Sequence, residues 1–162
     1  MNYSRTFTLH CRLNELERLR RRLHGFGRRA GLPPKAVWMI NLVLDELFTN
    51  IISHGCGNCG EKTVRFSLSR SGDDLAIKIE DNGIPFNPLS CEAPDVSCGL
   101  TERSIGGMGL HLVKHMMDHL HYRRCRDTNI LEMKKSLLAE CAGKGTKQNA
   151  TRTGRKANEE TD

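Results

Sequence analysis

Residues 63–80 constrain the fold more than any other stretch of this chain. Apolar and polar residues alternate on both sides of Ser71-Gly-Asp-Asp74, which is typical of a tight turn. The alternating apolar residues are Val64, Phe66 and Leu68 before the turn and Leu75, Ile77 and Ile79 after it. A period of two is the pattern of a half-buried strand, so the sequence predicts an antiparallel hairpin with one apolar face.

Two helices and a strand are predicted before this hairpin. Residues 5–10 alternate as a strand does, and residues 13–29 carry apolar residues at helical spacing with arginines between them. A second helix is expected to begin near Pro34, because proline suits a first helical turn. It should end near His54, because Gly55 suits a helix end.

The chain after the hairpin supplies the remaining elements. Residues 82–106 are rich in Pro, Gly and Cys and show no period, and so long a connection in a compact domain is usually functional. A third helix is predicted from Gly107 to about His119, and two further strands at 121–126 and 130–135. We therefore expect an α+β two-layer sandwich, with a mixed, mostly antiparallel sheet of about five strands and three helices on one face.

The C-terminal residues are expected not to belong to this domain. Residues 139–162 contain almost no large apolar side chain and cannot bury enough surface to offset their ordering entropy. The sequence thus predicts one domain over residues 1–138 and a disordered polar tail over 139–162.

Composition excludes several classes of protein. The net charge of +6 comes largely from arginines in residues 18–29, but no aromatic residues are interleaved with them, so nucleic-acid binding is not expected. There is no run of 18 apolar residues and no export signal, so we expect no membrane span and a cytoplasmic location. The seven cysteines are an odd number without a second CxxC, which favours reduced thiols over disulfides or a zinc site.

Three motifs in the chain carry the chemistry. The first is Glu46, Asn50 and His54, spaced i, i+4 and i+8 on one stripe of the second helix. Because Mg²⁺ favours few protein oxygens and several waters, a carboxylate and an amide at the margin of the core could hold it. The alternative interpretation of this stripe is a polar flank exposed to solvent.

The second motif, Asp81-Asn-Gly-Ile-Pro-Phe-Asn-Pro88, begins where the hairpin ends. A carboxylate at a strand end can accept a hydrogen bond from an exocyclic amine, and Gly83 leaves room for a flat ring to approach the backbone. The same residues are also an ordinary turn signal.

The third motif is Gly106-Gly-Met-Gly-Leu110, at the start of the third helix. Glycines at a helix N-terminus let backbone N–H groups close around a phosphate, and the helix dipole favours the anion. The motif is neither a Walker loop nor a complete dinucleotide-binding fingerprint.

In this order, the three motifs resemble those of the GHKL (Bergerat-fold) ATP-binding superfamily, over roughly residues 5–136. Asp81 to Leu89 and Gly106 to Lys114 look like the anti-sigma-factor serine kinase (RsbW-like) branch, in which a compact stand-alone domain is typical. One departure is that many superfamily members carry a Gly-Thr just before the last strand, whereas this chain has only Thr128 near that place.

The resemblance implies a role for each motif. Asp81 would bind the adenine amino group beside Gly83, Asn50 would ligate Mg²⁺, and residues 85–105 would form a lid. Glu46 would be the catalytic base that takes the proton from an attacking serine hydroxyl. The implied ATP- and Mg-binding residues are Asn50, Asp81, Gly83, Ile84, Phe86, Gly106, Gly107, Met108, Gly109, Leu110 and, as a weaker candidate, Thr128.

The resemblance also implies a function. It predicts an ATP-dependent serine/threonine protein kinase that phosphorylates a small STAS-fold anti-anti-sigma factor and sequesters a sigma factor. Dimerisation is common in the branch, so a homodimer is an expected assembly. The alternative is a non-catalytic protein in which ATP gates binding to a partner other than a sigma factor.

Overall fold

The structure is a computed structural model that describes residues 2–55, 62–90 and 107–138. Five strands form one sheet in the order β1-β2-β3-β5-β4. Their bounds are Asn2–His10 for β1, Thr63–Ser71 for β2, Asp74–Asp81 for β3, His119–Cys125 for β4 and Thr128–Ser136 for β5. The central hairpin is confirmed, with Phe66 opposite Ile79 and Ser71 opposite Asp74.

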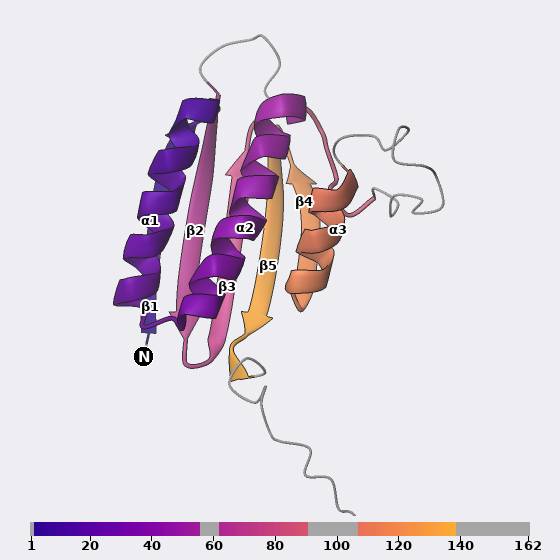
Figure 1. The fold of residues 1–162 in the computed structure, drawn as a ribbon. Coiled ribbons are helices and arrows are strands. Elements are labelled where there is room, and N and C mark those ends of the chain that lie inside the picture. Colours follow the sequence, from indigo (N-terminus) through magenta and orange to yellow (C-terminus); the bar gives the residue numbers. More distant parts are fainter. Residues whose placement is uncertain (1, 56–61, 91–106, 139–162) are drawn as a thin grey trace, which may run out of the picture.

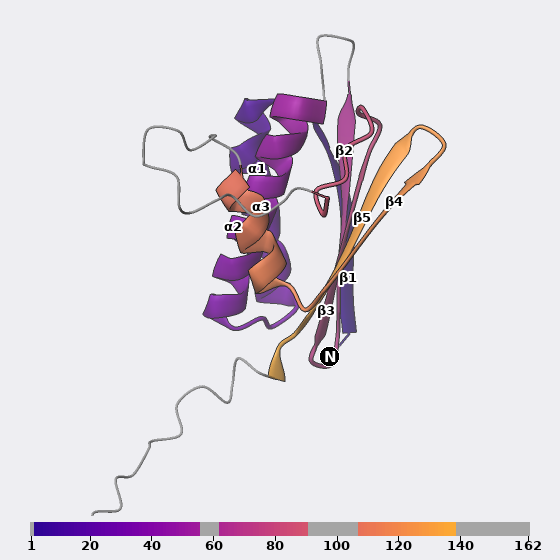
Figure 2. The same cartoon turned by 90° about the vertical axis from the view of Figure 1, so that its right-hand side faces the viewer.

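Three helices cover one face of this sheet. They are α1 (Leu16–Arg29), α2 (Pro34–Asn50) and α3 (Gly107–Met116), and a short 3₁₀ turn, Leu13–Glu15, precedes α1. Figure 1 shows the helices side by side in front of the strands, and Figure 2 shows the helix layer and the sheet edge-on. The predicted α+β two-layer sandwich is thus confirmed. All four pairings of the described strands are antiparallel, so the sheet there contains no parallel pair and is not mixed.

The core lies between the two layers. The inward side chains of β2 and β3 are almost fully buried, as their alternation predicts. Phe48 of α2 meets Phe66 of β2 edge-on, with ring centroids 5.5 Å apart, and Phe7 of β1 stacks on Phe66 at 5.4 Å. These contacts place α2 over the middle of the sheet. The rotation of α2 about its axis is thereby fixed, and with it the directions of its polar side chains.

Two helix boundaries differ from those expected. The α-helix of α2 ends at Asn50, and residues Ile51–Gly55 continue as a π-helix, so His54 is not on an ideal α-helical stripe with Glu46. α3 ends at Met116 rather than near His119, because His119 already pairs with Lys134 in the β4–β5 ladder.

The helical stretch Pro34–Gly55 is long and apolar enough to cross a membrane by length and composition alone. Core helices pass the same test, and seven residues of this one are buried in the core, although Trp38 is exposed. Those buried in the core are Ala36, Met39, Ile40, Val43, Leu44, Leu47 and Phe48.

Two of the seven cysteines lie in the described residues. Cys125 is an exposed free thiol. Cys11 is disulfide-bonded, so the expectation of reduced thiols is wrong for this residue. The other five cysteines, most of the expected lid and the predicted polar tail lie outside the described residues.

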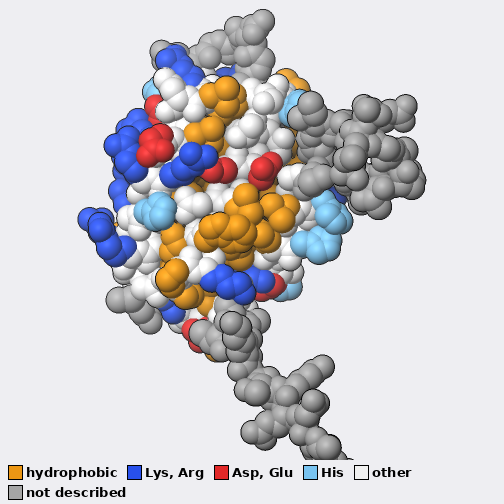
Figure 3. Space-filling model, in the orientation of Figure 1, with side chains coloured by type: hydrophobic (Ala, Val, Ile, Leu, Met, Phe, Trp, Pro, Cys, Tyr) orange, Lys and Arg blue, Asp and Glu red, His pale blue; other side chains and the backbone are white. Residues whose placement is uncertain are grey.

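The helix face of the molecule is uneven in charge. Lys and Arg side chains gather over α1, and hydrophobic side chains gather over α2 (Figure 3). One ion pair joins the two helices, in which Arg20 Nε lies 2.8 Å from Asp45 Oδ2. The carboxylate of Asp45 is therefore directed toward α1, away from that of its neighbour Glu46.

Candidate functional site

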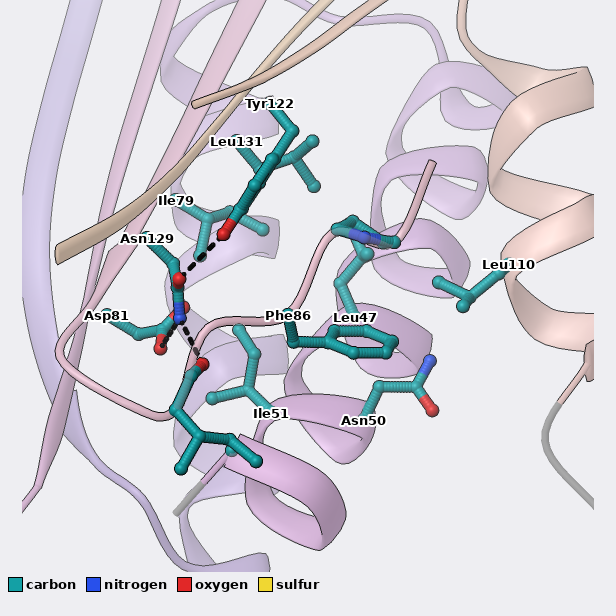
Figure 4. Close-up of a pocket in the computed structure, with 13 residues that line it drawn as sticks. Leu47, Asn50, Ile51, Ile79, Asp81, Phe86, Leu110, Tyr122, Asn129 and Leu131 are labelled. Carbon is teal, nitrogen blue, oxygen red and sulfur yellow. Dashed lines mark hydrogen bonds between the residues drawn. The ribbon is translucent and has the colours of Figure 1, made fainter. Parts of the chain in front are cut away.

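A cavity lies where α2 passes over the ends of β3 and β5 (Figure 4). Residues 82–90, which we call the strap, leave β3 and close one side of it. The lining brings together five of the predicted site residues, namely Asn50, Asp81, Ile84, Phe86 and Leu110. Residues far apart in sequence thus converge on one place, as the three motifs predicted.

Asp81 is the buried acid of this cavity. It ends β3 and is only 9% exposed. Its Oδ1 accepts a hydrogen bond of 2.9 Å from the backbone N–H of Gly83. A Cβ at Gly83 would lie 2.7 Å from the carbonyl oxygen of Gly55 and 2.8 Å from Asp81 Oδ1, so the strap can turn here only with glycine.

Asn129 is the site residue that the sequence did not reveal. It is 5% exposed, pairs with Asp81 in the β3–β5 ladder and lines the cavity. Its Nδ2 donates to Asp81 Oδ1 at 2.9 Å and to the carbonyl oxygen of Ile84 at 2.8 Å. Asn129 therefore joins the acid, the strap and the last strand.

Thr128 does not take part in this cavity. Neighbouring residues of a strand point to opposite faces of a sheet, and Thr128 lies with Thr8 and Arg65 in a neighbouring hollow that shares only Asp81 with the cavity. One signal in the sequence could have identified Asn129. Leu131 and Met133 face the core, and residues two apart in a strand lie on the same face, so residue 129 is expected to face the core as well.

Glu46 and the start of α3 are in direct contact. A Cβ at Gly109 would collide with Oε2 of Glu46 and lie 2.8 Å from its Cδ. Of the rest of the third motif, Gly107 and Met108 begin α3, and Gly106 lies outside the described residues. The carboxylate of Glu46 is thus held beside the helix start that was predicted to bind phosphate.

The residues beside the start of α3 carry the kinds of polar group that Mg²⁺ and a phosphate need. Asn50 lies one helical turn beyond Glu46 and lines the cavity, and its buried Nδ2 has no hydrogen-bond partner among the described residues. This N–H donor is available to an oxygen of a ligand such as a phosphate, whereas Mg²⁺ would have to be held through Asn50 Oδ1. The described residues contain no group of three or more His, Cys, Asp or Glu that could hold a metal ion by itself. An ion here would need water or phosphate oxygens as well, which suits Mg²⁺.

The cavity is nearly filled by its own side chains. Its volume is about 30 Å³, which is room for about two water molecules. The ring of Phe86 projects from the strap toward α2 (Figure 4) and stacks near His54, with centroids 6.4 Å apart. A purine base could enter only if side chains such as Phe86 moved.

Comparison with known proteins agrees with this geometry. The model of the histidine kinase-like ATPase domain matches residues 9–135. This range includes the three helices, β2, β3, β4, the cavity and all of β5 except its last residue, but only the last two residues of β1. The chain belongs to this ATPase family. The serine/threonine-protein kinase BtrW of Bordetella bronchiseptica is 29% identical over 85 residues, which are 52% of this chain and 60% of that protein. The serine-protein kinase RsbW of Listeria monocytogenes is 29% identical over 102 residues, 59% of this chain and 64% of that protein.

Further similarities place this ATPase-family domain in the anti-sigma-factor branch. The anti-sigma F factor of Clostridium perfringens is 30% identical over 98 residues, 59% of this chain and 70% of that protein. A solved structure of the RsbU and RsbW domains of Rv1364c from Mycobacterium tuberculosis matches with a TM-score of 0.56. It is 13% identical, and the match covers 83% of this chain and 32% of that one, so it supports the fold.

Proposed function

We propose that this chain is an ATP-dependent serine/threonine protein kinase of the anti-sigma-factor type. Its substrate would be a serine on a small STAS-fold anti-anti-sigma factor, and its second activity would be to bind a sigma factor. The observation that carries the proposal is the contact between Glu46 and Gly109, because it puts a carboxylate at the helix start where phosphate would bind. The names of the kinase relatives support the same activity.

The nucleotide would lie between Asp81 and the start of α3. Asp81 would accept a hydrogen bond from the adenine amine, and the N–H groups around Gly107 and Gly109 would face the phosphates. Asn50 would hold Mg²⁺, which neutralises phosphate charge when it is bound. Positioning and charge neutralisation are most of what phosphoryl transfer requires from a protein.

Glu46 would act on the protein substrate rather than on the nucleotide. Its carboxylate can accept the proton of a serine hydroxyl as that oxygen attacks the terminal phosphate. A positioned base of this kind contributes about 10²- to 10⁴-fold to a rate. Asp45 cannot share the role, because it is paired with Arg20 on the side of α1.

Phosphate transfer at this site would also decide which partner the domain binds. Phosphorylation would release the antagonist and leave the domain free to bind its sigma factor. Such partners act on transcription, so a cytoplasmic location is part of this proposal. A homodimeric assembly is also part of it, because dimerisation is common in the branch.

Incubation of the purified chain with labelled Mg-ATP and an extract of host proteins tests the activity. We expect one small protein to be labelled on serine by the wild type and by Asp45→Asn. Glu46→Gln should label it at least about a hundredfold more slowly, while binding ATP as the wild type does. Asp45→Asn is the matched control, because it removes the neighbouring carboxylate of the same helix.

Two results would contradict the proposal in different ways. Unchanged labelling by Glu46→Gln would show that Glu46 is not the base. ATP binding without transfer to any protein would favour the alternative, a nucleotide-gated binding protein. The nearly filled cavity suits that alternative as well, because nucleotide entry would have to move side chains of the strap such as Phe86.

A further inference from the structure

The hydrogen bonds of Asn129 use its whole side chain. Nδ2 donates to Asp81 Oδ1 and to the Ile84 carbonyl oxygen. Oδ1 accepts from the hydroxyl of Tyr122 at 2.8 Å and from Nη1 of Arg124 at 2.7 Å. A primary amide has two donors and two acceptor positions, so all four are occupied. If the Asn129 amide were rotated by 180°, its oxygen would face two acceptors and its NH₂ group would face two donors. The four hydrogen bonds therefore fix the orientation of the amide.

This orientation determines how Asp81 can meet a ligand. Oδ1 of Asp81 accepts from both Asn129 Nδ2 and the Gly83 N–H, each at 2.9 Å. The hydrogen bonds between described residues include none to Oδ2 of Asp81. The two N–H donors occupy Oδ1 as an acceptor and leave Oδ2 for the ligand. An acceptor in that place favours an N–H group and disfavours a carbonyl oxygen.

The same amide also sets the position of the strap. The Ile84 carbonyl oxygen accepts from Asn129, the Gly83 carbonyl oxygen accepts from Arg124 at 3.2 Å, and the Ile84 N–H donates to the Gly55 carbonyl oxygen at 3.2 Å. The backbone beside Asp81 is therefore held from β5, from β4 and from the end of the π-helix. The acid and the neighbouring strap backbone form one rigid unit, with Asn129 at its centre (Figure 4).

We propose that Asn129 is a positioning residue that sets base selectivity, by fixing Asp81 as a hydrogen-bond acceptor for a 6-amino purine and against a 6-oxo purine. The proposal rests on the proposed function, since it assumes that the cavity opens to admit a nucleotide. Selectivity is then a property of the pair rather than of Asp81 alone. Replacing the Asn129 amide by a group that cannot donate should weaken the preference for the 6-amino purine even though Asp81 stays in place.

The substitution Asn129→Asp tests this directly. It keeps the shape of the side chain but puts oxygen where Nδ2 stood, beside Asp81 Oδ1 and the Ile84 carbonyl oxygen. Two carboxyl groups so close cannot both be ionised without penalty, and they tend to share a proton. The shared proton makes the pair a donor for part of the time, which a 6-oxo purine can use.

Calorimetric titration with ADP and with inosine diphosphate, its 6-oxo counterpart, is the measurement. The wild type should prefer ADP by at least about tenfold, as expected for one hydrogen bond to a charged group. In Asn129→Asp this preference should fall at least about fivefold and vary with pH over the range where the shared proton is lost. Asn14→Asp is the matched control, because it makes the same chemical change at an exposed residue outside the strap and the cavity lining and should keep the wild-type preference.

A further variant separates positioning from folding. Asn129→Thr retains one hydroxyl donor that can face Asp81, so it should keep a preference for ADP even if its melting temperature falls. Should Asn129→Asp fail to fold, loss of the preference in Asn129→Ala with retention in Asn129→Thr would support the proposal. Equal preferences in these two variants would overturn it.

The outcomes also distinguish this proposal from the one on which it rests. A wild type that binds neither nucleotide would overturn the nucleotide site itself, and the role of Asn129 with it. A wild type that binds both equally would overturn only the selectivity. A folded Asn129→Asp protein with the wild-type preference would likewise overturn only the role of Asn129.

Discussion

The carboxylate of Glu46 occupies the space in which a side chain at Gly109 would begin. A Cβ at Gly109 would collide with Oε2 of Glu46. Two motifs more than sixty residues apart in sequence thus meet where the Glu46 carboxylate packs against Gly109, which has no side chain to exclude it. The requirement for glycine here comes from Glu46 as well as from any phosphate.

Gly109→Ala should therefore impair catalysis more than folding. The methyl group would displace the Glu46 carboxylate, so phosphate transfer should fall at least about tenfold, within the range of a misplaced base. Steady-state kinetics with the melting temperature measure both effects. Gly25→Ala is the control, because its Cβ would meet only the end of the Arg5 side chain, at 3.3 Å. Wild-type transfer by Gly109→Ala would show that Glu46 needs no such placement.

Gly83→Ala should affect both stability and nucleotide binding. Its Cβ would lie 2.7 Å from the backbone oxygen of Gly55, which cannot move aside as a side chain can. Overpacking of this kind costs about 1–3 kcal/mol. We expect a lower melting temperature and ATP binding at least about tenfold weaker by calorimetry. Unchanged values for both would mean that the strap adapts without cost.

Most of the fold follows from periodicity, because β2, β3 and the first two helices carry clear apolar patterns. The hairpin of β2 and β3 and the helix from Pro34 are examples. Helix ends were less predictable. The apolar residues of the sequence do not distinguish the π-helix at Ile51–Gly55 from a continued α-helix. The early end of α3 at Met116 depends on the pairing between β4 and β5, which a local pattern does not encode.

The site was predictable where a motif is local and not where it depends on strand register. Asp81, Asn50 and Glu46 could be identified because each belongs to a short local pattern. Thr128 was chosen in place of Asn129, and a difference of one residue along a strand exchanges the two faces of a sheet. The closed state of the cavity depends on how Phe86 packs, which no local pattern encodes.

Asp118 gives a prediction about pH. Its Oδ1 accepts from Lys135 Nζ at 2.8 Å and its Oδ2 from the Ser136 N–H at 2.7 Å. The hydrogen bond from Lys135, followed by that from Ser136, lowers the pKa of Asp118 below its usual 3.8. A lowered pKa stabilises the fold above pH 3.8, and that stability is lost as the pH falls through the folded-state value.

Asp118→Asn should thus lower the melting temperature at pH 7, and the difference from the wild type should shrink as the pH falls below 3.8. The side chain is 40% exposed, so the difference in unfolding free energy should not exceed about 1 kcal/mol. Thermal denaturation at a series of pH values measures it. Asp127→Asn, in the exposed β4–β5 turn, is the matched control. A difference that does not shrink at low pH would contradict the assignment to the ion pair.

Calorimetric titration of Mg-ATP into the wild type and Asp81→Asn tests the central claim, that this cavity is an adenine-nucleotide site. The substitution can keep an oxygen for the N–H groups of Gly83 and Asn129, but it puts an amide NH₂ donor where Oδ2 would accept from the base. We predict that the wild type binds and that Asp81→Asn, with its fold intact, binds about ten to a hundred times more weakly. Equal binding by the two proteins, or no binding by the wild type, would contradict the account.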